Sequence, residues 1–63
     1  MKWYIVIFSS TDYYTMYEGY EIVKGKSPVE AKDKAIKIKY NGDLPSYCNV
    51  ESIICTGNTK PVE

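Results

Sequence analysis

The run Trp3–Phe8, WYIVIF, decides the fold of this chain. An unbroken series of aromatic and β-branched residues is typical of a strand that is buried on both faces. Because side chains alternate along a strand, the run predicts two apolar sets on opposite faces. These sets are Trp3, Ile5 and Ile7 on one face, and Tyr4, Val6 and Phe8 on the other. Such a strand belongs in the middle of a sheet.

A second strand is expected next along the chain. The residues Ser9–Asp12 have the chemistry of a turn, and the β-prone stretch Tyr13–Val23 that follows is interrupted by Gly19. The clearest strand pattern within it is Tyr20–Lys24. We therefore expect a β-hairpin whose tip is rich in tyrosine.

A helix is predicted over residues 28–40. Ser27 is placed to be its N-cap, Pro28 occupies the first helical position, and Glu30 completes a capping box. The pair Asn41-Gly42 ends the helix, since either residue can take the left-handed conformation of a C-cap.

A third strand is expected over Tyr47–Cys55, followed by a turn at residues 56–58 and a tail at 59–63. The predicted fold is therefore a single α+β domain over residues 1–58 with the order ββαβ. A right-handed crossover through the helix places the third strand parallel to the second and antiparallel to the first. The predicted sheet order is 2-1-3, with the helix across one face.

One helix covers only one face of such a sheet, so one apolar set of the first strand stays uncovered. At about 100° per residue, Ala31, Ala35 and Ile38 share the side of the helix expected to face the sheet. A second apolar group lies nearly opposite and is either scattered surface residues or a second contact surface: Val29, Ile36 and Tyr40. With the uncovered face, it favours a homodimer or an obligate partner.

Composition argues against an enzyme. The 63 residues contain no histidine and no arginine but seven tyrosines, and the net charge is zero. The commonest general base and metal ligand is therefore missing, and we expect neither a cofactor nor a metal. Cys48 and Cys55 lie too far apart along one strand to form an intrachain disulfide, and the alternative to two free thiols is intermolecular pairing through Cys55. Two free thiols fit a cytoplasmic protein, and the first apolar run is too short for a signal peptide or a membrane span.

The tyrosine-rich segment is the strongest functional candidate, because tyrosine and methionine are enriched in interface cores. The residues predicted to bind a partner are Asp12, Tyr13, Tyr14, Met16, Tyr17, Glu18 and Tyr20. The acidic residues, with Glu21, favour a basic partner surface. The alternative is a β-ribbon whose tyrosines pack across the strands.

The sequence thus predicts a small non-enzymatic protein-binding module, a stoichiometric inhibitor or modulator of a partner protein. The alternative is a nucleic-acid-binding regulator that uses helix lysines and stacked tyrosines. Those lysines are offset by Glu30 and Asp33, which favours an ordinary solvated helix surface. They are Lys32, Lys34, Lys37 and Lys39.

The segment Tyr20–Ala31, followed by Ala35, resembles the strand-loop-helix segment of HicB-type antitoxins, which have a partial ribonuclease-H-like fold. The glycine-cysteine element that usually precedes that segment is missing, so no residue role is carried over. In general character the chain also resembles the short accessory proteins of bacteriophages and mobile elements. That resemblance implies a protein that blocks a host enzyme or a defence complex by covering one of its surfaces.

Overall fold

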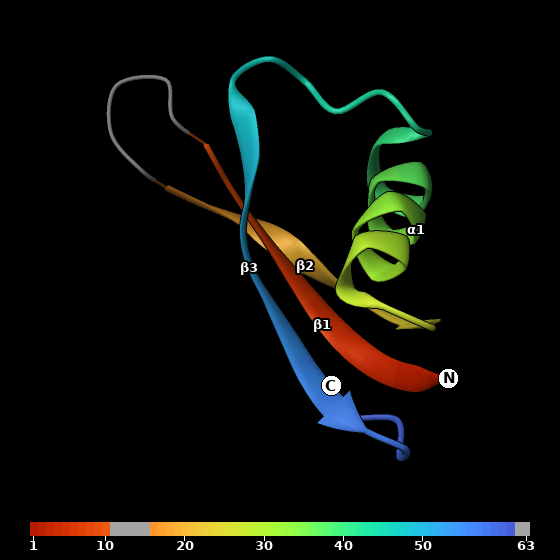
Figure 1. Cartoon of the computed structure of the whole chain (residues 1–63). Helices are drawn as coiled ribbons and strands as arrows, with labels where there is room; N and C mark the ends of the chain where they lie inside the picture. The colour runs from red at the N-terminus through yellow and green to blue at the C-terminus, as the bar shows by residue number, and fades with distance from the viewer. Residues whose placement is uncertain (11–15, 62–63) are drawn as a thin grey trace.

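The computed structural model describes residues 1–10 and 16–61. Strand β1 (Lys2–Ser10) lies in the centre of a three-stranded sheet, between β2 (Met16–Gly25) and β3 (Cys48–Gly57). Both outer strands run antiparallel to β1, and helix α1 (Pro28–Tyr40) lies against one face of the sheet (Figure 1). The predicted α+β class, the order ββαβ and the sheet order 2-1-3 are all confirmed.

The core lies between β1 and α1. Tyr4, Val6 and Phe8 form the face of β1 that the helix covers, and the last two are fully buried. Val23 of β2 and the helix residues Ala31 and Ala35 complete the buried cluster. The other set of β1 lies on the helix-free face and is half-buried: Trp3, Ile5 and Ile7.

Both ends of α1 lie where the sequence predicts, but only the Ser27 half of the predicted capping box forms. The Ser27 Oγ accepts a hydrogen bond from the Glu30 N–H at 3.2 Å. The Glu30 carboxylate accepts from the Lys26 N–H at 3.1 Å, one residue before the N-cap. At the other end Asn41 has φ 57° and Gly42 has φ 87°, so both residues adopt the left-handed conformation.

The predicted inward face of the helix is partly wrong. Ala31 and Ala35 are fully buried as expected, but Ile38 is 62% exposed. Ile36 and Tyr40, which we placed on the opposite side, pack against the core. The helix faces the sheet along a line between the two predicted apolar groups, because Ala35 permits a close approach on one flank and the larger side chains fill the other.

This packing also changes the predicted second contact surface. Ile36 and Tyr40 pack against the core, and only Val29 of that group is strongly exposed, at 66%. The three residues therefore do not form one outward-facing apolar stripe.

The two cysteines are free thiols in opposite environments: Cys48 is buried and Cys55 is exposed. Both lie on β3, as predicted. Within the described residues, no helix is long and apolar enough to cross a membrane.

Candidate protein-binding surface

The helix-free face of the sheet carries a continuous apolar surface. Ile5 of β1 pairs with Ile22 of β2 on one side and with Ile54 of β3 on the other. Residues that are paired across strands share a face, so these isoleucines form a row across the sheet. We call the following set the open face: Trp3, Ile5, Ile7, Tyr17, Tyr20, Ile22 and Ile54.

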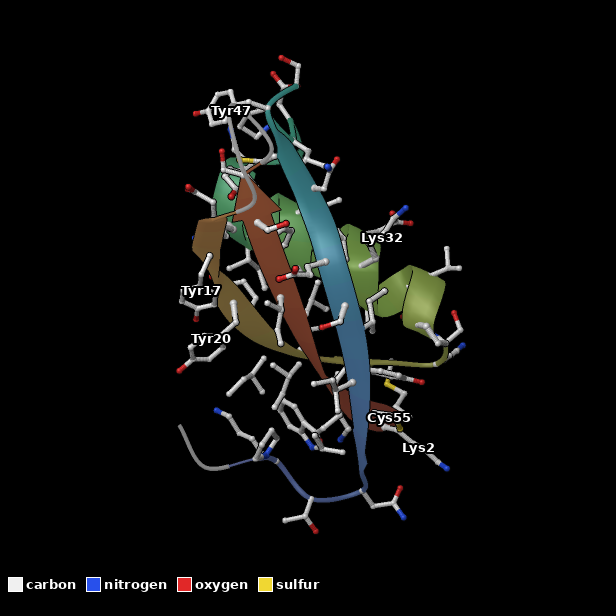
Figure 2. The ribbon with its side chains drawn as sticks, turned by 90° about the vertical axis from the view of Figure 1, so that its left-hand side faces the viewer. Lys2, Tyr17, Tyr20, Lys32, Tyr47 and Cys55 are labelled. Atoms are coloured by element: carbon white, nitrogen blue, oxygen red, sulfur yellow. The ribbon has the colours of Figure 1, made fainter. Side chains whose placement is uncertain are left out.

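A β-bulge brings two tyrosines onto this face. The register with β1 passes from Phe8↔Gly19 to Ser9↔Tyr17, so Glu18 is an extra residue in β2. Gly19 has φ 114°, a backbone conformation that favours glycine. Without the bulge, residues three apart in a strand would point to opposite faces. With it, Tyr17 and Tyr20 point to the same side, as Figure 2 shows.

The open face is accessible as well as apolar. Tyr17 is 64% exposed, Tyr20 is 40% exposed and Ile54 is 46% exposed. Trp3, at the other end of the face, lies between two lysines: the Nζ atoms of Lys24 and Lys60 are 5.7 Å and 5.6 Å from the centre of the indole ring. The face therefore has tyrosines at one end and a tryptophan between cations at the other.

The structure separates the sequence-predicted site residues. Tyr17 and Tyr20 lie on the open face, and Glu18 is exposed in the bulge. Glu21 pairs with Val6 and so belongs to the helix side of the sheet, which removes it from the acidic border expected around the tyrosines. Other predicted residues lie outside the described part of the structure: Asp12, Tyr13, Tyr14 and the side chain of Met16.

Sequence reasoning missed the role of Ile22 and Ile54 as open-face neighbours of the tyrosines. Each lies two or three residues along its strand from another residue of the same sheet face. Which face that is depends on the register with β1. The register is shifted by a bulge in both outer strands, and a bulge reverses the faces of all residues beyond it. Gly19 lies at the shift in β2 and Gly57 at one of the two shifts in β3, and both have a positive φ, whereas no glycine lies at the other β3 shift, at Glu51.

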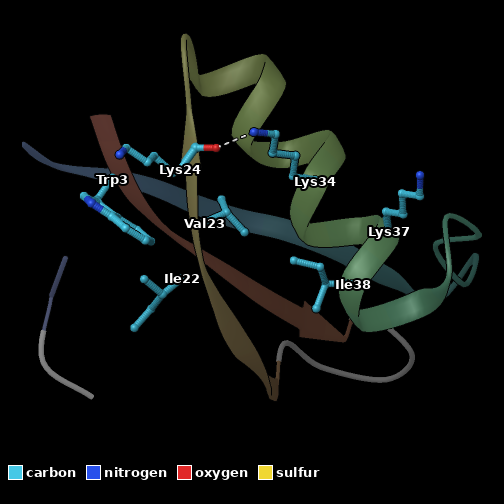
Figure 3. Close-up of a pocket in the computed structure, with 7 residues that line it drawn as sticks. All are labelled: Trp3, Ile22, Val23, Lys24, Lys34, Lys37 and Ile38. Atoms are coloured by element: carbon cyan, nitrogen blue, oxygen red, sulfur yellow. Dashed lines mark hydrogen bonds between the residues drawn. The ribbon is translucent and has the colours of Figure 1, made fainter. Parts of the chain in front are cut away.

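A groove of about 360 Å³ runs along the outer edge of β2, between this strand and α1 (Figure 3). Its lining combines apolar and basic side chains and contains no carboxylate: Trp3, Ile22, Val23, Lys24, Lys34, Lys37 and Ile38. The Lys34 Nζ donates to the Lys24 carbonyl at 2.7 Å and lies 3.4 Å from the Glu30 carboxylate. We call this feature the β2 groove.

A second hollow, of about 740 Å³, lies on the opposite flank of α1 next to β3. It is lined by Ile36, Leu44 and Val50, and its charged side chains are of both signs, Lys32 and Glu51. Mixed charge gives this hollow no preference for a partner of either sign.

The lysines of α1 do not form one basic surface. Lys34 and Lys37 line the β2 groove, whereas Lys32 lines the hollow beside β3. The Lys39 Nζ lies 5.5 Å from the centre of the Tyr40 ring. This divergence weakens the case for a phosphate-binding helix face, which needs several cations along one line.

Two core tyrosines stay neutral to high pH. Burial raises the pKa of Tyr40 to about 12, helped by the hydrogen bond between its hydroxyl and Cys48. Burial also raises the pKa of Tyr4, which lies beside the Cys55 thiol. Neither hydroxyl is therefore suited to act as a base near neutrality. Among residues 1–10 and 16–61, no group of three or more Cys, Asp or Glu side chains is arranged to hold a metal ion.

Comparisons of this chain with protein-family models, with curated proteins and with solved structures find no match. Its function must therefore be inferred from its own surface.

Proposed function

We propose that this chain is a small protein-binding module that acts without catalysis, as a stoichiometric inhibitor or modulator of a partner protein. The open face is its contact surface. The observation that carries the proposal is that α1 covers one face of the sheet and leaves aromatic and branched side chains uncovered on the other. Burying a fully exposed side chain of this kind contributes about 1.5–3 kcal/mol. The open-face side chains are already partly buried, so each contributes a fraction of that amount, and a partner gains by covering several together.

The size of the face favours a different protein over a second copy. Strands of nine and ten residues give a flat area of roughly 500 Å² at about 3.3 Å per residue and 4.8 Å between strands. A stable interface commonly buries roughly 800 Å² on each partner. Two copies stacked face to face have only this face to share, whereas a different protein can also extend around the edge of β2.

The test is binding to one purified partner. Affinity capture with and without nuclease identifies candidates, and calorimetry with the purified candidate then gives affinity and stoichiometry. Ile54→Lys places a charge at the β3 end of the isoleucine row, and Val29→Lys is the matched control on the exposed helix surface, since both are exposed aliphatic residues. We expect one-to-one binding that Ile54→Lys weakens by about a hundredfold, or roughly 3 kcal/mol, and that Val29→Lys leaves unchanged.

Three results would contradict the proposal. Capture that disappears with nuclease would indicate nucleic acid, the alternative class. Equal binding by the wild type and by Ile54→Lys would exclude the open face. Sedimentation of the pure protein as a dimer that Ile54→Lys converts to a monomer would make a second copy the occupant.

A further inference from the structure

The outer edge of β2 offers a long, regular template for another strand. From Gly19 to Gly25, β2 pairs with β1 in unbroken register, and within the described residues its other edge pairs with no strand. The edge of β3 is different, because register shifts occur between Trp3 and Tyr4 and between Ile7 and Phe8. Bulges are a common way in which proteins prevent strand addition. Although β2 also has a bulge, at Glu18, its part from Gly19 to Gly25 is thus the longer unshifted template of the two edges.

The backbone groups at this edge point outward at known positions. The Lys24 carbonyl accepts from Lys34 at 2.7 Å, and Figure 3 shows it directed away from β1. Alternate residues of an antiparallel strand direct their N–H and C=O groups to the same edge. The amides of Tyr20 and Ile22 therefore face outward with that of Lys24, and they are available to an incoming chain.

The β2 groove provides side-chain contacts on both sides of this edge. Trp3 and Ile22 belong to the open face, whereas Val23 pairs with Tyr4 and faces the helix. Ile38 of α1 lines the groove from the helix side and is 62% exposed, so it is accessible to an incoming chain. Because the side chains of an added strand alternate, one set would meet Trp3 and the other would meet Ile38.

The charge of the β2 groove indicates which kind of segment it can bind. Its three lysines have no carboxylate among the other lining residues. Lys34 is partly neutralised by Glu30, while Lys24 and Lys37 form no ion pair in the described part of the chain. A segment with Asp or Glu side chains would supply the negative charge that the lining residues lack. A second copy placed here by two-fold symmetry would bring the same lysines instead, and the aliphatic walls and free amides suit a polypeptide better than a nucleic acid.

We propose that the β2 groove binds an extended acidic segment of the partner protein, which adds to the edge of β2 as a fourth strand. This inference rests on the proposed protein-binding function and names the chemistry of its partner. Main-chain hydrogen bonds would give affinity, and the alternating pockets with their lysines would give specificity.

Labelled synthetic peptides test this proposal directly. The probe is a capped peptide of the length of β2 in which isoleucine alternates with glutamate, and its partner peptide has lysine in place of each glutamate. Two further probes carry N-methyl groups on alternate residues, one on the odd set and one on the even set. Only one set of amides faces β2 in an added strand. We expect the acidic peptide to bind at least about tenfold better than the lysine peptide, and only one N-methylated probe to lose binding.

Protein variants and amide spectra locate the site. Ile38→Glu and Lys37→Glu change exposed groove residues, and each should weaken binding of the acidic peptide by about tenfold or more. Lys32→Glu is the matched control, because Lys32 lines the other hollow. In heteronuclear NMR spectra the amides of Tyr20, Ile22 and Lys24 should shift on binding and exchange more slowly with solvent.

The outcomes separate the two proposals. No binding of the acidic peptide, equal binding of the lysine peptide, tolerance of both N-methyl patterns, or shifts confined to β3 would each overturn strand addition. If the purified partner still binds in a manner that depends on Ile54, the protein-binding function stands without strand addition. If Ile54→Lys also leaves the affinity for the purified partner unchanged, both proposals fail.

Discussion

The hydroxyl of Tyr40 donates to Cys48 Sγ over 3.7 Å and so joins the last residue of α1 to the first residue of β3. The same ring meets Phe8 of β1 edge to face, with the ring centres 5.4 Å apart. The helix end and two strands therefore meet around one side chain. This contact explains why Tyr40, although only half-buried, packs against the core.

Two substitutions at Tyr40 should separate the contribution of its ring to the free energy of unfolding from the contribution of its hydroxyl. We expect Tyr40→Ala to lower the free energy of unfolding by about 3 kcal/mol, because it removes the ring that packs on Phe8. Tyr40→Phe keeps the ring and loses the hydrogen bond, at a cost of about 0.5–1.5 kcal/mol. Urea unfolding measures both. Tyr17→Ala is the control at an exposed tyrosine, and an equally large loss there would contradict the assignment of Tyr40 as the core ring.

Stability should fall at alkaline pH through the same residue. The pKa of Tyr40 rises from 10.0 to about 12 in the folded chain, first because of burial and then because of the bond to Cys48. Between these values the unfolded chain loses its proton while the folded chain keeps it, so stability is full below pH 10 and declines as pH rises toward 12. Burial of Tyr4 acts in the same direction. Denaturation midpoints measured across this range should decline less in Tyr40→Phe than in the wild type, and an identical decline would be inconsistent with the role of Tyr40.

The helix–sheet spacing gives a third prediction. Ala35 is fully buried against the sheet, so Ala35→Leu must displace the helix or strain its neighbours and should cost about 1–3 kcal/mol. Val29→Leu places the same residue at a 66% exposed position and should have almost no effect. Thermal unfolding followed by circular dichroism compares the two variants. Unchanged stability in Ala35→Leu would mean that the helix does not pack closely at this point.

The beginning of α1 should respond to mutation and to acid. Ser27→Ala removes the acceptor for the Glu30 N–H and should cost about 1 kcal/mol. The pKa of Glu30 is lowered, mainly by the hydrogen bond from the Lys26 N–H. The stability from this carboxylate is therefore present above its ordinary pKa of 4.5 and is lost as pH falls below it. Acid unfolding of Glu30→Gln should start from a lower stability and show a weaker pH dependence than the wild type.

The sequence was sufficient to predict every element and its order, because each has a strong local signal. The helix begins and ends where Ser27 and Asn41 predict, and Trp3–Phe8 is the centre of the sheet. What it could not predict depends on contacts between elements. The rotation of α1, which buries Ile36 and exposes Ile38, is set by how alanines and larger residues fill the space above the sheet.

The candidate site was predictable only in part for the same reason. Tyr17 and Tyr20 could be identified from composition, but their common face depends on the bulge at Glu18. The β2 groove could not be predicted, because it brings together side chains from two strands and the helix. Local patterns do not specify such distances between elements.

The last prediction decides between the two roles that the sequence leaves open for the tyrosines, interface or cross-strand packing. The double variant Tyr17→Ala plus Tyr20→Ala removes two exposed rings of the open face. Cross-strand pairs contribute about 0.2–1 kcal/mol each, and Tyr20 pairs with Ile7 while Tyr17 pairs with Ser9. If the rings serve binding, the variant unfolds within a few degrees of the wild type and loses affinity for the purified partner. If they serve the fold, the melting temperature falls by much more than this pairing predicts, and the open face must be assigned to stability. Calorimetric unfolding and partner titration on the same preparation measure both quantities, because affinity is interpretable only for a chain shown to be folded.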